Sequence, residues 1–83
     1  MASGYIQKDL VIEIVSDTTN QDGIIVTDIP YSKFVSAAVN TSGINYFAVG
    51  RQSNSGTLVI FIFGGTMTAI INTQVEVKII RFN

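Results

Sequence analysis

The stretch TLVIFIFGG, residues 57–65, decides the fold class of this chain. Its apolar run of six residues, 58–63, has the length of a strand and falls far short of the roughly 20 residues that a helix needs to cross a bilayer. Because a strand shows alternate side chains to opposite faces, both faces of this strand are apolar. One face carries Val59, Phe61 and Phe63, and the other carries Leu58, Ile60 and Ile62. A small core covers one face, so the other needs a different cover.

Short segments rich in β-branched and aromatic residues follow one another along the chain, separated by Gly, Asn, Asp or Ser. The strands expected from this pattern are 6–16, 24–27, 33–40, 44–51, 57–63, a short one around 67–71, and 73–82. Six or seven short antiparallel strands predict two packed sheets. The sequence therefore predicts an all-β fold, a small antiparallel and jelly-roll-like β-sandwich that forms a single domain over residues 1–83.

Alternation of apolar and polar residues assigns an inner face to the first and last strands. In the last strand, we expect Val75, Val77 and Ile79 inside and the charged residues between them outside. In the first strand, the residues expected inside are Leu10, Ile12 and Ile14, and those expected outside are Asp9, Val11 and Glu13. The loop that follows the first strand should close with an Asx-type turn into Asp22-Gly23.

Other strands carry apolar residues on the face that should meet water: Phe34 and Ala38 in the third, Tyr46 and Ala48 in the fourth, and Ile80 and Phe82 in the last. Burying two aromatic and two aliphatic side chains per subunit stabilises an assembly by on the order of 6–10 kcal/mol. Oligomerisation is one of the few stabilising devices open to a small domain without disulfides or metal. We therefore expect self-association, with an interface that includes Phe34, Leu58, Ile60, Ile62, Ile80 and Phe82.

Two other interpretations of the strand 57–63 remain open. It can be a central strand covered by the core on one side and by a long loop on the other. It can also present an exposed, aggregation-prone face, which soluble proteins rarely tolerate.

Composition excludes several classes of function. The chain has no cysteine and no histidine, so disulfides, thiolate metal sites and the commonest general base are absent. Its five Lys and Arg residues are scattered against six Asp and Glu, a net charge of −1, which predicts no nucleic-acid partner. We expect no membrane insertion, and the first residues show no signal peptide. Few charges and many hydroxyls and amides suit a virion or extracellular protein.

The carboxylates do not predict an active site. A glycosidase needs two carboxylates at a defined separation across a cleft, whereas Asp9 and Glu13 share a strand face and Asp17 and Asp22 share a loop. Asp17, Asn20 and Asp22 could supply oxygen ligands to calcium from that loop, but their spacing does not match that of an EF-hand. The sequence predicts no enzyme, no cofactor and no metal site.

Four segments resemble the C-terminal head domains of bacteriophage tail fibres and related receptor-binding or minor structural proteins. They are IPYSKFVSAAV (29–39), NYFAV (45–49), GTLVI (56–60) and INTQVEVKII (71–80), and the similarity covers roughly residues 6 to 82 in loose β-periodic motifs. The resemblance implies a jelly-roll-like sandwich that forms a homotrimer on a phage tail and binds a saccharide receptor on the bacterial surface. No heptad repeat or Gly-X-Y shaft precedes residue 6.

A saccharide site needs an aromatic face for stacking and planar polar side chains for the sugar hydroxyls, and loops on a rigid scaffold are the usual place for both. The candidates are Tyr31, Tyr46, Arg51, Gln52 and Asn54, and Arg51 is the best partner for an anionic sugar or phosphate. Both tyrosines can equally be half-buried sandwich residues. Asn40-Thr-Ser also matches a glycosylation sequon. The alternative function is a structural assembly or decoration protein of a virion, with no ligand of its own.

Overall fold

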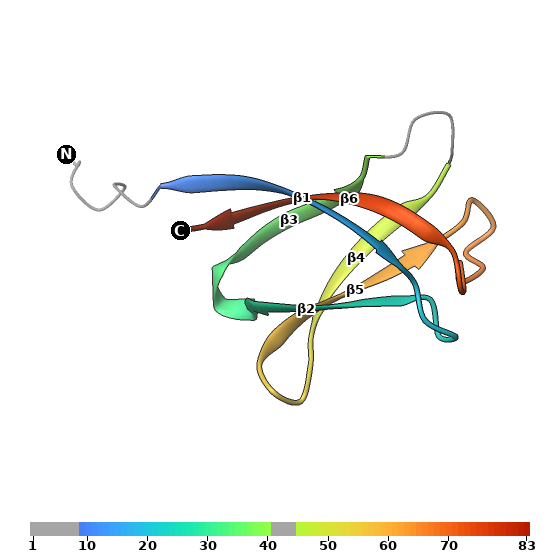
Figure 1. The fold of residues 1–83 in the computed structure, drawn as a ribbon, viewed down its shortest axis with the longest axis horizontal. Coiled ribbons are helices and arrows are strands. Elements are labelled where there is room, and N and C mark those ends of the chain that lie inside the picture. The colour runs from blue at the N-terminus through green and yellow to red at the C-terminus, as the bar shows by residue number, and fades with distance from the viewer. Residues whose placement is uncertain (1–8, 41–44) are drawn as a thin grey trace.

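A computed structural model describes residues 9–40 and 45–83 of the chain. It has β1 (Leu10–Thr18), β2 (Ile24–Pro30), a 3-10 turn (Tyr31–Lys33), β3 (Phe34–Val39), β4 (Phe47–Gln52), β5 (Thr57–Phe63) and β6 (Gln74–Phe82). The strands form two three-stranded antiparallel sheets (Figure 1). The first sheet has the order β1-β6-β3, and the second has the order β2-β5-β4. The predicted all-β sandwich is confirmed, while the jelly-roll detail stays a prediction.

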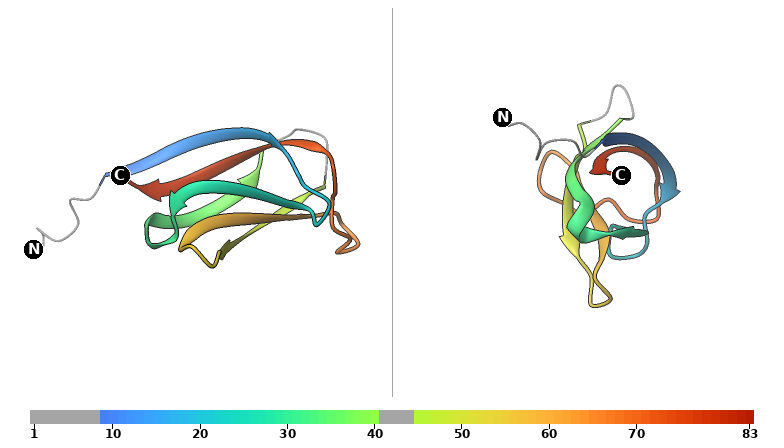
Figure 2. Two further views of the ribbon diagram at one scale, coloured as in Figure 1. Left: turned by 60° about the horizontal axis from the view of Figure 1, so that its bottom comes forward. Right: turned by 90° about the vertical axis from the view of Figure 1, so that its left-hand side faces the viewer.

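The two sheets lie as two layers, one over the other (Figure 2). Each central strand pairs with an early strand of the chain: β6 with β1 and β5 with β2. β3 and β4 approach each other from the two sheets, so the layers close on that side. The stretch 67–71 is not a strand: apart from a single bridge between Ala69 and Phe63, it is loop. The expected starts of the first and fourth strands, 6–8 and 44, lie outside the described residues.

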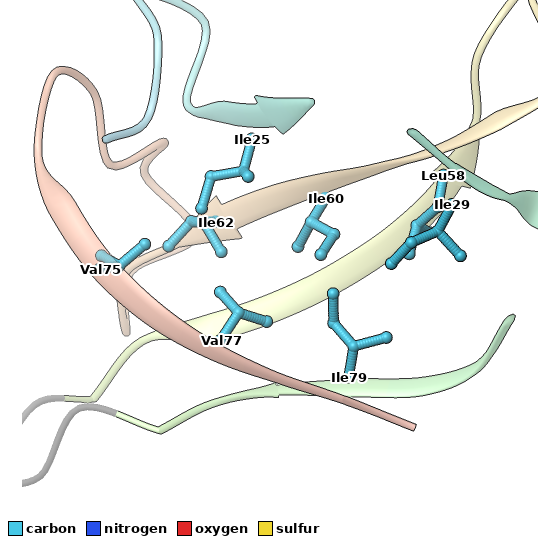
Figure 3. Close-up of a cluster of buried hydrophobic side chains, with 8 residues drawn as sticks. All are labelled: Ile25, Ile29, Leu58, Ile60, Ile62, Val75, Val77 and Ile79. Atoms are coloured by element: carbon cyan, nitrogen blue, oxygen red, sulfur yellow. The ribbon is translucent and has the colours of Figure 1, made fainter. Parts of the chain in front are cut away.

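The core lies between the two central strands. Leu58, Ile60 and Ile62 of β5 point toward Val75, Val77 and Ile79 of β6, and all six are at most 2% exposed (Figure 3). Ile25 and Ile29 of β2 complete this cluster. The inner face predicted for the last strand is therefore confirmed.

The faces predicted for the first strand are wrong. Leu10, Ile12 and Ile14 are 59%, 62% and 48% exposed, whereas the intervening Val11, Glu13 and Val15 are half-buried and face the second sheet. The physical reason lies in the pairing, because residues directly opposite each other in an antiparallel pair share a face. Glu13 lies opposite Ile79 and Val15 lies opposite Val77. The buried residues of β6 therefore decide which face of β1 turns inward.

A β-bulge in β3 turns Phe34 inward, although the sequence placed it on the face toward water. Phe34 lies opposite Arg81 and Ser36 lies opposite Ile80, so Val35 is an extra residue without a partner. Phe34 and Ala37 consequently share the inner face and pack against the core, while Val35 is exposed. A local pattern of alternation cannot show such an insertion.

The faces expected for the fourth strand are also reversed. Ala48 lies opposite the buried Ile62, and Ala48 and Tyr46 pack against the core. Phe47 and Val49 therefore point away from the core and are 54% and 40% exposed.

The turn between β1 and β2 has the predicted Asx geometry. The side-chain oxygen of Asn20 accepts hydrogen bonds from the backbone N–H groups of Asp22, at 2.8 Å, and Ile24, at 3.1 Å. Gly23 has φ +76°, a conformation that favours glycine. Within residues 9–40 and 45–83, no helix has the length and apolar character to cross a membrane.

Candidate assembly and binding surfaces

The outer face of the second sheet is a continuous apolar surface. Thr57 of β5 lies on this side of the sheet, opposite Pro30. The outer face proper consists of eight residues of the three strands: Ile24, Val26, Phe47, Val49, Arg51, Val59, Phe61 and Phe63. Seven of the eight are apolar, and Val26, Phe47 and Val49 are the most exposed of these. Contiguous apolar patches of this kind mark interaction sites on soluble proteins. The second apolar face of residues 57–63 lies on this surface, and nothing in the described chain covers Val59, Phe61 and Phe63 completely.

Arg51 is the charged member of this outer face, and it lies over an aromatic ring. Its guanidinium carbon is 5.8 Å from the centroid of the Phe61 ring. The Phe61 ring in turn stacks on Phe63, with centroids 6.3 Å apart and an angle of 16° between the rings. An arginine in this position gains cation–π and stacking contacts while its guanidinium stays in water.

The outer face of the first sheet is less uniform. Leu10 lies opposite Phe82 and Ile12 lies opposite Ile80, which makes one apolar corner. Farther along the sheet, Ile14 lies opposite Lys78. Glu76 follows on the same face of β6 and accepts a hydrogen bond of 2.8 Å from the side-chain amide of Asn40.

The interface expected from the sequence is wrong in four of its six residues. Leu58, Ile60 and Ile62 are fully buried in the core of the chain itself, and Phe34 packs inward beside Tyr31. Their side chains are therefore not available to a partner. Ile80 and Phe82 do lie on an outer face, that of the first sheet. The signal that sequence reasoning missed is the pairing of β5 with β4 and β2, which places the odd-numbered residues of β5 outside.

Three of the five candidate saccharide residues meet at one end of the sandwich. The backbone N–H of Tyr31 donates a hydrogen bond of 3.0 Å to the carbonyl of Gly56 in the turn between β4 and β5. Gln52 ends β4 beside that turn, with its amide nitrogen 4.0 Å from where a Cβ on Gly56 would lie. Asn54 is exposed within the turn itself.

The other two candidates lie elsewhere. Tyr46 precedes the opposite end of β4 and packs against the core. Arg51 lies on the outer face of the second sheet, whereas Tyr31 turns its ring inward and stacks on Phe34 at 5.9 Å. The five residues therefore do not form one site. Asn40 is exposed, and the rest of its sequon lies outside the described residues.

A cleft of about 490 Å³ lies between β1 and β2, where the two sheets are open. It is lined by Glu13, Val15, Val26, Thr27, Asp28 and Ile29. Sequence reasoning did not single out Asp28, which joins Glu13 in this lining only through the fold. Glu13 is already held by an ion pair of 2.8 Å with Arg81. In the described part of the chain, no group of three His, Cys, Asp or Glu residues is placed to hold a metal ion.

Compared with protein-family models, with curated proteins and with solved structures, the chain matches none of them.

Proposed function

We propose that this chain is a non-enzymatic assembly domain, which functions as a homo-oligomer within a larger particle of the phage-fibre type. The outer face of the second sheet is the observation that supports self-association, and the phage-fibre setting is taken from the sequence resemblance. This face presents seven apolar side chains and one arginine to solvent or to a partner. Because exposed apolar surface is costly in water, burial of such a face drives association.

The size of the domain supports the same conclusion. A chain of 83 residues buries only roughly 60–65% of the surface that it exposes when unfolded, so its own core gives modest stability. The described core consists of eight aliphatic side chains. Phe47 and Val49 are 54% and 40% exposed, so covering them adds roughly half of the 1.5–3 kcal/mol that full burial of such a side chain contributes. Association through an outer face therefore adds to the modest stability of the core.

Light scattering of the purified chain over a range of concentrations tests this function. We expect a mass of at least twice 9.0 kDa, the mass of one chain. Val49→Glu places a charge on the outer face of the second sheet, and Ile12→Glu places one on the first sheet. At least one of these variants should dissociate the oligomer while its circular dichroism remains that of a folded β protein. A wild-type mass of 9.0 kDa at all concentrations would overturn the proposal.

A trimeric head that binds a bacterial surface saccharide is the second candidate function. The exposed side chains of Gln52 and Asn54 at one turn favour it, because amides that project from a rigid turn can bind sugar hydroxyls. Tyr31 joins this turn through its backbone alone, since its ring stacks on Phe34. Binding of the protein to host cells and to purified cell-wall polysaccharide tests this function. The double variant Gln52→Ala/Asn54→Ala should lose binding, and Gln21→Ala in a distant loop is the matched control. Equal binding by all three proteins would exclude this site.

A further inference from the structure

We propose that the outer face of the second sheet binds the same face of a second copy, about a two-fold axis that runs across the strands. In this arrangement, Arg51 of each subunit packs on Phe47 of the partner subunit. The inference rests on the proposed self-association and names the surface and symmetry that would produce it.

The outer face has a direction along its strands. Its residues lie in three rows that cross the sheet, as the pairing of β2, β5 and β4 shows. Arg51 lies in the first row, Phe61 lies in the middle row, and Phe47 lies in the third row. The full rows are Val26, Val59 and Arg51; Ile24, Phe61 and Val49; and Phe63 and Phe47, beside which the loop residue Ala69 forms an isolated bridge to Phe63. One end of the face is therefore cationic and the other is aromatic. Along a strand, these ends are about 13 Å apart.

The guanidinium of Arg51 contacts one aromatic ring of its own chain. One side faces Phe61 of its own chain at 5.8 Å. Arg51 is exposed, and it has no carboxylate within ion-pair distance in the described residues. A planar cation that is weakly hydrated can lie between two aromatic rings without losing its charge. The other side of the guanidinium is thus a place for an aromatic side chain from outside the chain.

Symmetry decides which residue meets Arg51. When two copies of a sheet pack face to face, their two-fold axis lies in the plane between them. An axis parallel to the strands would place the first row of one subunit on the first row of the other, with the order of the strands reversed. Arg51 would then meet the aliphatic Val26 of the partner subunit. That contact would desolvate a charge without compensation. An axis across the strands places the first row on the third, so that Arg51 meets the ring of Phe47 of the partner subunit.

The same axis makes the middle of the contact apolar. Val49 and Phe61 lie in the middle row, so each meets its own counterpart in the partner subunit. The outer face of the first sheet does not have this self-complementary pattern. There, Lys78 and Glu76 interrupt the central strand β6, and the apolar residues gather at one corner. A second copy therefore fits the second sheet better than the first.

A charge swap tests the contact. Arg51→Glu places an anion on the aromatic end of the partner, and Phe47→Lys places two cations together, so each variant should weaken dimerisation at least tenfold. The double variant Arg51→Glu/Phe47→Lys should restore the dimer at low salt, because each new anion then meets a new cation of the partner subunit. Within one chain, the two positions are too far apart to pair. Lys33→Glu makes the same charge change on the exposed 3-10 turn and should leave the dimer intact.

Cross-linking provides a second measurement that leaves the charges in place. The chain has no cysteine, so a single introduced thiol is unique. Facing sheets lie about 10 Å apart, which suits a short bismaleimide better than a direct disulfide. Val49→Cys should cross-link to a dimer in high yield, and Ile12→Cys on the first sheet should not.

The outcomes separate this inference from the proposed function. A mass near twice 9.0 kDa, dissociation by the single charge variants and restoration by the double variant would support both. This contact would be overturned by a trimer, by an oligomer whose dissociation constant is unchanged in these variants, or by an oligomer that cross-links through Ile12→Cys. Each of these results would still support self-association. Dissociation without restoration by a folded double variant would overturn the axis across the strands. A monomer at every concentration would overturn both proposals.

Discussion

Glu13 of β1 and Arg81 of β6 form an ion pair on the inward-facing side of the first sheet, with Oε1 and Nε 2.8 Å apart. Their side chains are 38% and 24% exposed, so the pair lies at the open margin of the sandwich and not in its core. A second guanidinium nitrogen of Arg81 donates to the carbonyl of Phe82 at 3.1 Å. The pair explains how a strand can turn a carboxylate inward: the partner strand presents a cation beside it.

We expect this ion pair to contribute modestly to stability. In a double-mutant cycle with Glu13→Gln and Arg81→Met, the coupling free energy should be about 0.5–1.5 kcal/mol, since partly exposed pairs are screened by solvent. Urea unfolding of the four proteins measures this coupling free energy. The coupling should decrease in 0.5 M salt, because the Debye length is then roughly 4 Å and the attraction between the two charges is screened. A coupling indistinguishable from zero at low salt would show that the two side chains do not interact in solution.

The reversed faces of β1 lead to a second prediction, which compares two isoleucines. Ile79→Thr buries a hydroxyl among apolar side chains and should destabilise the fold by about 2–4 kcal/mol. Ile12→Thr makes the same chemical change at a position that is 62% exposed and should change stability by about 0.5 kcal/mol or less. Thermal unfolding in dilute solution, where association is least, compares the two. Equal losses of stability would indicate that Ile12 is as buried as Ile79, which would contradict the observed register.

The sequence predicted the parts of the fold whose signal is local. The alternation in residues 75–79 correctly placed its valines and isoleucine inside, and Asp22-Gly23 correctly marked a turn. The faces predicted for β1, for β4 and for the start of β3 were wrong because each is decided by a partner strand or by the bulge at Val35, and neither leaves a local trace. In β3 after the bulge, Ala38 is exposed as predicted. In β1 in particular, both faces carry aliphatic residues, so alternation alone could not choose between them.

The candidate binding site failed for a related reason. Arg51 and Gln52 are neighbours in sequence, but successive residues of a strand point to opposite faces. Tyr46 is six residues from Gln52, which in an extended strand is about 20 Å. Tyr31 joins the turn between β4 and β5 through a backbone hydrogen bond to Gly56, a contact between distant segments that composition cannot indicate.

A third prediction concerns the close approach of Gly50 to Phe34. A Cβ added at Gly50 would lie 2.5 and 2.6 Å from two ring carbons of Phe34 and 3.0 Å from Cδ1 of Leu58. Gly50→Ala should therefore destabilise the protein by about 1–3 kcal/mol through overpacking. In the double variant Gly50→Ala/Phe34→Leu, the loss should be smaller than the sum of the two single losses, because the shorter side chain makes room. Strict additivity in urea unfolding would contradict the contact.

The last prediction concerns the irregular pairing of β2 with β5. Val26 lies opposite Val59 and Pro30 lies opposite Thr57, so four steps along β2 span two steps along β5. The hydroxyl of Thr27 bridges this interruption: it donates to the carbonyl of Leu58 at 2.7 Å and accepts from the N–H of Ile29 at 3.2 Å. One side chain thus replaces the ladder bonds that the extra residues remove.

Removal of this hydroxyl should be costly, although the side chain keeps its shape. Thr27→Val leaves a carbonyl and an N–H group without their partner and should destabilise the fold by about 1–3 kcal/mol. Thr27→Ser, which keeps the hydroxyl, should lose less than about 1 kcal/mol, because only a methyl group is removed. Urea unfolding ranks the variants, and amide hydrogen exchange at Ile29 should accelerate in Thr27→Val alone. If the valine variant matched the wild type in both measurements, water would be satisfying the bulge, and the Thr27 hydroxyl would not be what holds β2 against β5.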